Sequence, residues 1–369
     1  MLMKIWGHVS YFLKDFGPYL IILFTASIFF LFSIIKIYKS KISQNKKNAL
    51  LLLVFTLVSF IFIYSGFEAY LRFRFDESDS LGFLKVSERW FQRHVVFNNF
   101  NYRDKKFTLD KTPGVVRIGV IGDSLAMGYG IKNINDRFSN ILEKKLNDNG
   151  SHVEIYNFAQ SGFDTEHETL EYQKVKKFNF DILLWSYFLN DIEEASKSAG
   201  TAVLKKAQEL PSPLIQFLSD NSFLFNYIYW RLDARYDKTF SNLKNADLSQ
   251  YDDQAVFSHH KQLISSFSAQ LQAENKKTVV VIFPFFYFFP NYPLDAIAVH
   301  NRMDKIFQDN GALAIVDMLN YVKGKNKNEL VVGPYDAHPN EYVHNLTAEK
   351  LYDAIFPLLE NKDGQTFIK

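Results

Sequence analysis

The sequence predicts an α/β sandwich preceded by two membrane-spanning helices. Two apolar runs near the N-terminus each extend over 20 residues without a charged side chain. From about Thr112 onward, short apolar segments alternate with helical patterns, and this alternation is typical of a parallel sheet between helical layers. The length of 369 residues allows about two structural units at roughly 150 residues each.

The two apolar runs, residues 16–35 and 48–67, are each long enough to cross a membrane. At 1.5 Å per residue, about 20 helical residues span a hydrocarbon layer of ~30 Å. Buried core helices are the alternative, but such helices are rarely apolar on every side over this length. A cleaved signal peptide is a second alternative for the first run, and the following span argues against it.

The short segment between the spans indicates their orientation. Residues 36–47 contain five lysines and no acidic side chain, and the positive-inside rule places such a segment in the cytoplasm. We therefore expect two spans in the cytoplasmic (inner) membrane, with most of the chain on the periplasmic or extracellular side. The predicted division is a transmembrane anchor at residues 1–75, a connecting segment at 76–112 and an α/β domain at 113–369.

The predicted strands are short, continuous apolar runs. A continuous run, rather than an alternating one, is typical of a strand buried on both faces of a parallel sheet. Five such runs occur, at residues 115–121, 153–159, 182–188, 279–285 and 312–319.

Helical patterns separate these runs. Apolar side chains step by three or four residues from Ile134 to Leu146, and weaker patterns cover residues 259–273 and 346–359. Residues 195–254 do not fit the alternation and predict an inserted, mostly helical cap. A lid, a partner surface and simple packing all remain open as roles for this insertion.

Composition and spacing exclude several kinds of site. The formal net charge is only +2, whereas nucleic-acid binding requires a basic face. The chain has no cysteine, so disulfides, thiolate catalysis and thiolate metal sites are excluded. His167, His259 and His260 have no zinc-motif spacing. We interpret these three as solvated histidines and expect neither a metal nor an organic cofactor.

Residues 122–125 read Gly-Asp-Ser-Leu and stand between the first predicted strand and the first helix. A strand-to-helix turn presents the Ser124 hydroxyl at the rim of the sheet, and the N–H groups of the helix start favour an oxyanion. Helix capping is the alternative interpretation. A phosphate-binding loop is excluded because Tyr129 follows Gly128. The nucleophile elbow of α/β-hydrolases is excluded because Ala126 replaces its second glycine.

Three further signals follow in the sequence. Asp336 and His338 lie in the segment Asp-Ala-His-Pro-Asn near the C-terminus. A histidine is the usual base for a serine, and a neighbouring acid orients it. Asn190 follows the third predicted strand and can donate to an oxyanion, while Gly162 follows the second and allows close backbone approach. A loop histidine, a helix cap and an ordinary turn glycine are the respective alternatives.

Together these signals resemble the SGNH (GDSL) hydrolase superfamily, whose conserved blocks run in the same order. The resemblance covers roughly residues 116–359. It implies a flavodoxin-like three-layer α/β/α sandwich with a five-stranded parallel sheet. It also implies Ser124 as nucleophile, His338 as base and Asp336 as orienting acid. The implied oxyanion hole consists of the N–H groups of Ser124 and Gly162 and the side chain of Asn190.

Two departures from the superfamily pattern occur. The acid stands two residues before His338, where three is common. Phe188 and Leu189 replace the glycine that often precedes Asn190. The first departure affects the assignment of Asp336, and the second alters the wall of the site.

The resemblance implies an extracytoplasmic serine esterase or deacylase that acts on acyl esters of envelope glycans or lipids. One alternative is an O-acyltransferase for envelope polysaccharide that works with a multi-span membrane acyltransferase. Another is a catalytically silent scaffold that binds a glycan or a partner. The aromatic segment 283–293 predicts an acyl-binding wall or a membrane contact, with packing beneath the cap as the alternative.

Overall fold

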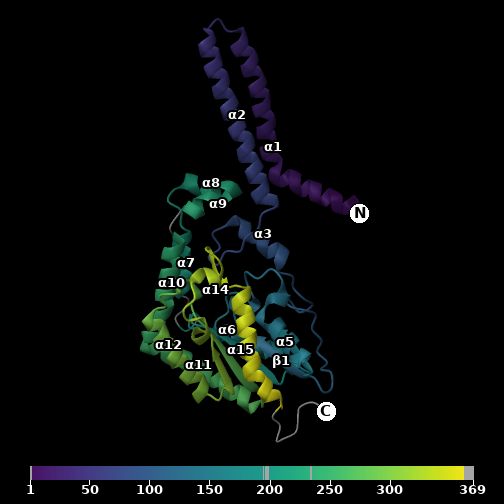
Figure 1. Ribbon diagram of the computed structural model, residues 1–369, viewed down its shortest axis with the longest axis vertical. Helices are drawn as coiled ribbons and strands as arrows, with labels where there is room; N and C mark the ends of the chain where they lie inside the picture. The colour runs from purple at the N-terminus through teal and green to yellow at the C-terminus, as the bar shows by residue number, and fades with distance from the viewer. Residues whose placement is uncertain (1, 194, 196–198, 233–234, 361–369) are drawn as a thin grey trace. The chain divides into compact units, whose positions relative to one another are not determined.

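The chain forms two compact units. The computed structural model describes residues 2–193, 195, 199–232 and 235–360 (Figure 1). One unit contains Met1–Asp76 and Leu210–Leu232, and the other contains Glu77–Glu209 and Asp233–Lys369. The predicted insertion at residues 195–254 is therefore shared between the units. Its residues 196–198 and 233–234, and residues 361–369 of the predicted α/β domain, lie outside the described residues.

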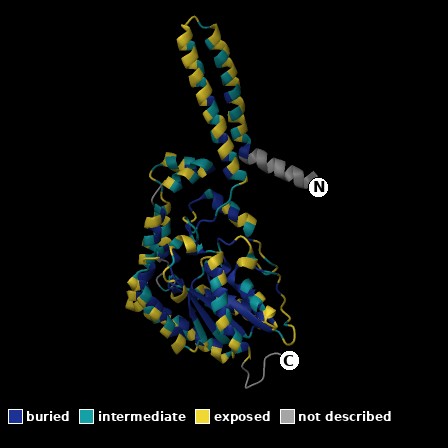
Figure 2. Cartoon of the chain, in the orientation of Figure 1, coloured by how far each residue is buried: buried dark blue, intermediate teal, exposed yellow. Residues whose placement is uncertain are grey.

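The first unit is built around two long helices, α1 (Leu2–Lys39) and α2 (Gln44–Phe73). Both are long and apolar enough to cross a membrane. Most of the described apolar side chains of these helices are exposed, as the predominance of yellow in Figure 2 shows. A core helix of a water-soluble protein would bury such side chains. Two short helices of the insertion, α8 (Pro213–Asn221) and α9 (Phe223–Leu232), complete this unit.

The second unit contains the predicted five-stranded parallel sheet. Its strand order is β2-β1-β3-β4-β5, and all four pairings are parallel. This is the flavodoxin-like order. All five predicted strands are present, with ends shifted by three residues at most: β1 (Val116–Ile121), β2 (Val153–Asn157), β3 (Ile182–Phe188), β4 (Lys277–Phe283) and β5 (Ala314–Asp317).

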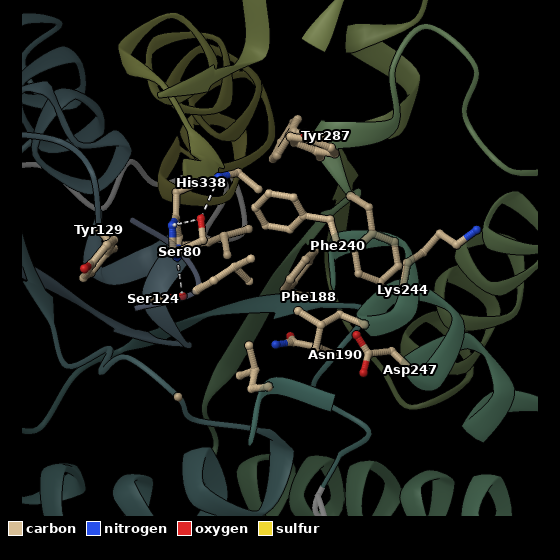
Figure 3. A pocket seen from close by; sticks show the side chains of 18 of the residues that line it. Ser80, Ser124, Tyr129, Phe188, Asn190, Phe240, Lys244, Asp247, Tyr287 and His338 are labelled. Atoms are coloured by element: carbon tan, nitrogen blue, oxygen red, sulfur yellow. Dashed lines mark hydrogen bonds between the residues drawn. The ribbon is translucent and has the colours of Figure 1, made fainter. Parts of the chain in front are cut away.

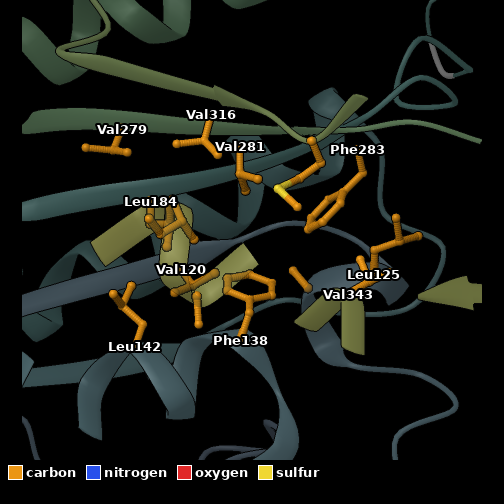
Figure 4. Packing of buried hydrophobic residues seen from close by; sticks show 14 of the residues in the cluster. Val120, Leu125, Phe138, Leu142, Leu184, Val279, Val281, Phe283, Val316 and Val343 are labelled. Carbon is orange, nitrogen blue, oxygen red and sulfur yellow. The ribbon is translucent and has the colours of Figure 1, made fainter. Parts of the chain in front are cut away.

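Helices cover both faces of the sheet. Leu184 of β3 packs in a core with α5 (Phe138–Asp148) and α15 (Glu341–Glu360), part of which Figure 4 shows. Its neighbours Leu183 and Trp185 pack in the opposite core. That core includes α6 (Thr165–Val175), α11 (Gln254–Ala273) and α12 (Leu294–Asp309). Successive strand residues point to opposite faces, so the continuous apolar runs fill two cores and the three-layer sandwich is confirmed.

The remaining elements lie at the ends of the sheet and in the insertion. They are α3 (Lys85–His94), α4 (Ser124–Met127), η1 (Ile134–Asp136), η2 (Lys176–Phe178), α7 (Ala199–Gln208), α10 (Arg235–Asp252), η4 (Phe286–Phe288), α13 (Leu319–Val322), α14 (Lys327–Leu330), β6 (Val331–Gly333) and β7 (Asp336–Pro339).

The first amphipathic helix begins later than its pattern predicts. Ile134 lies in the short turn η1 and not in α5, which begins at Phe138. The Asn133 side chain accepts the N–H of Asn135 at 3.0 Å, which favours a separate capped turn. A second difference is the antiparallel pair of β6 and β7, which places Asp336 and His338 on a short strand.

Candidate active site

Ser124 lies where the sequence places it, at the turn between β1 and α4. A Cβ atom on Gly122 would lie 2.7 Å from Cβ of Ser186 and 2.8 Å from Cβ of Ala126, so only glycine allows the turn to pack this closely on β3. The Asp123 side chain accepts the N–H of Leu125 at 2.9 Å and caps α4. The capping alternative therefore applies to Asp123 and leaves the Ser124 hydroxyl free for another partner.

A chain of hydrogen bonds connects Ser124 to the C-terminal pair, and Figure 3 shows its first link, between Ser124 and His338. Ser124 Oγ lies 2.9 Å from His338 Nε2. On the other side of the ring, His338 Nδ1 lies 2.6 Å from Asp336 Oδ1, which also accepts the backbone N–H of His338 at 3.1 Å. The two-residue spacing of acid and base therefore allows direct contact. In this arrangement Asp336 orients the ring and leaves Nε2 facing the serine.

The charges at this site oppose the effect of burial. Burial by itself would lower the pKa of His338, but the negative charge of Asp336 and its hydrogen bond outweigh burial and raise that pKa above the usual value. Burial would likewise raise the pKa of Asp336, yet the charge of His338 and its hydrogen bond hold it below the usual range. The pair therefore favours a carboxylate beside an imidazole that accepts protons readily.

Both predicted oxyanion-hole partners line the same cavity as Ser124. Gly162 has a φ of 81°, a left-handed conformation that favours glycine. Within the described part of the chain, and apart from its two chain neighbours, no heavy atom lies within 4 Å of a Cβ built on it. The backbone conformation thus explains this glycine, rather than crowding by protein. Asn190 also lines the cavity. It follows β3, as predicted, and Figure 3 shows its side chain on the cavity wall.

The cavity has a volume of about 500 Å³. Ser124 and His338 lie at one side of it in Figure 3, and Phe188, Phe240 and Lys244 line the part beyond them. Its apolar wall combines β3, the segment after β4 and two helices of the insertion. The apolar lining residues beyond the serine are Phe188, Leu204, Phe240, Leu243, Phe285, Phe286, Tyr287 and Phe288.

The aromatic segment 283–293 divides between the cavity and the core. Phe286 lines the cavity and also packs in the core together with Phe289, whose ring stacks on Tyr292 with ring centroids 4.9 Å apart. The segment therefore contributes to the cavity lining and to the core, and its role in acyl binding stays a prediction. The cavity also borders α7 and α10, because Leu204 and Phe240 line it, so these parts of the insertion form a wall of the site.

Ser80 is a member of the site that sequence analysis missed. Its hydroxyl donates to Asp336 Oδ1 at 2.7 Å, accepts the N–H of Ala337 at 2.6 Å and lies 3.3 Å from His338 Nδ1. Ser80 belongs to the connecting segment, 256 positions from Asp336. The segment carries no recognisable motif, so no local signal identifies this serine.

Asp79 holds the loop that carries Ser80. Its carboxylate accepts the N–H groups of Leu81, Phe83 and Leu84 at 2.6–2.9 Å. The hydroxyl of Tyr236 donates to the same carboxylate at 3.0 Å. An aspartate that accepts N–H groups two to five residues later forms a turn. The sequence alone does not distinguish this turn from an Asx-turn on the protein surface.

One predicted solvated histidine is wrong. His260 is fully buried on α11, and its Nε2 lies 2.9 Å from the Tyr187 hydroxyl. Burial lowers its pKa to about 3, so it packs as a neutral ring. Its neighbour His259 is exposed, because adjacent helical positions face different directions. Among the described residues, no group of three or more His, Asp or Glu side chains has metal-binding geometry.

Comparison with known proteins gives matches among solved structures only. No family model matches the chain, and no curated protein matches it. Similar solved structures include TesA, which is 15% identical with a TM-score of 0.40 over 66% of this chain and 99% of that chain. An acetyl xylan esterase, AlAXEase, is 14% identical with a TM-score of 0.40 over 65% and 100%. A GDSL-like lipase from Bacteroides thetaiotaomicron is 14% identical with a TM-score of 0.38 over 69% and 93%.

These similarities are too low to assign an activity. The chain covers nearly the whole length of each of these proteins, but the TM-scores stay below 0.5. The chemistry of this chain therefore has to be inferred from the geometry of its own site.

Proposed function

We propose that this chain is a membrane-anchored serine ester hydrolase of the SGNH (GDSL) superfamily. Its α/β unit would lie on the periplasmic or extracellular side of the cytoplasmic membrane and act on acyl esters of envelope glycans or lipids. The observation that supports this most directly is the aligned series Ser124, His338 and Asp336, which opens on a partly apolar cavity. The lysine-rich segment between the two candidate spans supports the orientation.

In the proposed reaction, His338 Nε2 takes the proton from Ser124 Oγ as the oxygen attacks the ester carbonyl carbon. The negative charge that develops on the carbonyl oxygen is stabilised by the N–H groups of Ser124 and Gly162 and by the Asn190 side chain. His338 then returns the proton to the leaving alkoxide, and an acyl-serine remains. Asp336 holds the ring in place and stabilises its protonated form throughout.

The second half of the reaction decides between hydrolysis and transfer. Water attacking the acyl-serine releases a free acid, whereas a sugar hydroxyl attacking it gives a new ester. Both use His338 as the base. Transfer to an envelope polysaccharide, with a multi-span membrane acyltransferase supplying the acyl group, is the alternative within the same chemistry. A catalytically silent scaffold is the alternative outside it.

The proposal is tested with the purified full-length chain in detergent micelles. A fluorophosphonate probe should form a covalent adduct that peptide mass spectrometry assigns to Ser124. The same preparation should hydrolyse p-nitrophenyl acetate and longer acyl esters. Ser124→Ala should abolish both signals. Ser249→Ala is a matched control, because this exposed hydroxyl bonds only within its own helix, to the Ala246 carbonyl at 2.7 Å.

The outcomes separate the three functions. Labelling of Ser124 together with hydrolysis supports the esterase. Labelling without hydrolysis indicates an activated serine that needs another acceptor, and so favours transfer. An unlabelled Ser124 in folded protein would contradict both enzymatic functions and favour the scaffold.

A further inference from the structure

The helix α8 carries exposed apolar side chains that no function proposed so far uses. Leu214 is 66% exposed and Phe217 is 62% exposed. They stand three residues apart, which places them on the same side of the helix. Gln216 and Asp220 occupy another exposed side and bond to each other at 2.8 Å. The exposed surface of α8 thus has an apolar part, at Leu214 and Phe217, beside a polar part at Gln216 and Asp220.

The side of α8 that faces protein is mixed, because Ile215 and Leu218 are partly buried beside a polar contact. Ser219 is buried, and its hydroxyl accepts a hydrogen bond from the Asn226 side chain of α9 at 3.0 Å. A surface helix of a water-soluble unit buries its large apolar residues and exposes polar ones. In α8, Leu214 and Phe217 remain exposed, which is typical of a helix with one side in contact with lipid.

Hydrogen bonds fix α8 and α9 to the end of α2. Glu68 is fully buried and follows directly on the apolar run 48–67. Its carboxylate accepts the N–H groups of Phe223 and Leu224 at 3.0 and 2.8 Å, at the start of α9. It also accepts the hydroxyl of Ser222 at 2.8 Å. An anion at a helix N-terminus is a favourable arrangement, so Glu68 both ends the apolar run and caps α9.

Arg72 and Tyr19 extend this junction to α1. Arg72 donates to Glu68 at 2.8 Å and to the carbonyl of Asn221, the last residue of α8, at 2.9 Å. The Tyr19 hydroxyl donates to the same carbonyl at 3.1 Å. Tyr19 lies in the first turn of the apolar run of α1 and Glu68 directly after that of α2, so the end of α8 is level with the boundary of both runs.

We propose that α8 is an interfacial helix that inserts its Leu214 and Phe217 side into the outer leaflet of the bilayer crossed by α1 and α2. This rests on the proposed membrane anchor. Amphipathic helices at such a level bury their apolar side at the boundary between headgroups and acyl chains. Aromatic and arginine side chains such as Tyr19, Tyr64 and Arg72 are typical of that boundary. The partner of this surface is lipid, and the helix fixes the depth at which the anchor lies.

The absence of cysteine from the chain allows a direct test. Single-cysteine variants of the full-length protein are labelled with a nitroxide in proteoliposomes, and collision with oxygen in lipid is compared with collision with a water-soluble nickel chelate. The test positions are Leu214→Cys and Phe217→Cys. Gln216→Cys and Asp220→Cys are matched controls on the same helix. Phe29→Cys, an exposed position within α1, reports on the span itself.

We expect labels at 214 and 217 to collide with the nickel chelate about tenfold less than labels at 216 and 220, and to approach the label at 29. Equal water accessibility at all four α8 positions, with the label at 29 in lipid, would overturn the interfacial helix and leave the anchor intact. Protection of 214 and 217 from both reagents would also overturn it, because protein and not lipid would then cover them. A water-exposed label at 29 would refute the anchor and the interfacial helix together.

Discussion

Among the histidine–aspartate pairs of the described α/β unit, two that are largely or fully buried have the same chemistry and different surroundings. His338 Nδ1 lies 2.6 Å from Asp336, and His300 Nδ1 lies 2.9 Å from Asp317. The first contact has the geometry of a hydrogen bond. The second does not, because His300 Nδ1 has no aligned acceptor despite its proximity to the carboxylate. In both pairs the carboxylate therefore lies close to the imidazole, but only in the His338–Asp336 pair are the two groups aligned for a hydrogen bond.

The pairs differ further at the second ring nitrogen. His338 Nε2 meets the hydroxyl of Ser124 in the cavity, whereas His300 Nε2 lies 3.1 Å from the hydroxyl of Tyr292 in the interior. His300 is fully buried, so a substrate has no access to it. A His–Asp pair thus indicates a catalytic base only together with a nucleophile and an accessible space.

Replacing each histidine with alanine should give the largest contrast. His338→Ala should lower kcat for p-nitrophenyl acetate by about 10⁵-fold, because the serine loses its base. His300→Ala should keep kcat within about twofold per folded molecule and lower the thermal unfolding midpoint by about 5 °C, because a buried ring is lost. Ester hydrolysis and thermal unfolding of the full-length protein measure both. A comparable loss of kcat in His300→Ala would invalidate the distinction between the pairs.

Replacing each aspartate with asparagine should give the next largest contrast. Asp336→Asn should lower kcat by about 10³- to 10⁴-fold, because the ring loses its orientation and the partner for its positive charge. Asp317→Asn should change kcat by less than about threefold, since Asp317 is not among the described residues that line the cavity. The same ester hydrolysis assay measures kcat of both variants. An equal loss of kcat in the two variants would contradict the predicted difference between Asp336 and Asp317.

The pH dependence follows from the raised pKa of His338. The base must be neutral, so kcat/KM should fall about tenfold per pH unit below that pKa. Because Asp336 raises the pKa of His338, the midpoint should lie above the ordinary value of about 6.5. In Asp336→Asn, burial dominates and the midpoint should move to lower pH. A midpoint that moves upward would show that Asp336 does not determine the pKa of His338.

Ser80 should have a smaller effect, through the position of Asp336. Ser80→Ala should lower kcat about tenfold with little change in KM, because a hydrogen bond that holds the carboxylate is lost. The midpoint of the pH profile should rise slightly. Without the hydrogen bond from Ser80, the Asp336 carboxylate should interact more strongly with protonated His338 and raise its pKa further. Ser80→Thr should restore the profile.

The matched control for Ser80 is Ser87→Ala. Ser80 is partly buried and Ser87 is buried, but the Ser87 hydroxyl bonds to the Leu84 carbonyl at 2.6 Å, within the start of its own helix. A similar loss of kcat in both variants, without a pH shift in Ser80→Ala, would reduce Ser80 to a packing residue.

The cavity wall should have the smallest effect on acetyl esters and a larger effect on esters with long acyl chains. Phe288 lines the cavity and packs edge-on against Phe285, with ring centroids 6.3 Å apart. Phe288→Ala should lower kcat/KM for octanoyl esters by about tenfold and for acetyl esters by about twofold, because a long acyl chain loses more apolar contact. Phe257→Ala, at a partly buried phenylalanine outside the cavity lining, should affect both esters alike. An equal loss on both esters in Phe288→Ala would contradict an acyl-binding wall.

The sequence predicted the sheet and the turn that carries Ser124, because each depends on a local pattern. Continuous apolar runs mark strands buried on both faces, and Gly122 allows the tight turn on β3. The segment with Asp336 and His338 was also predicted. Its strand β7 was not, since a four-residue strand carries too little periodicity to distinguish it from a loop.

Only the tertiary structure decided how distant segments meet. Ser80 reaches Asp336 across 256 positions, and His260 is buried while His259 is exposed. Phe286 and Phe289 share one core, but only Phe286 of the two is among the described residues that line the cavity. The insertion 195–254 is shared between the two units, and the hydrogen bonds of Glu68 to the start of α9 hold its middle part in the first unit. Local sequence determines which residues form a turn, a strand or a helical face. The partner that each face meets depends on strand order and on packing across the whole chain, which no short pattern encodes.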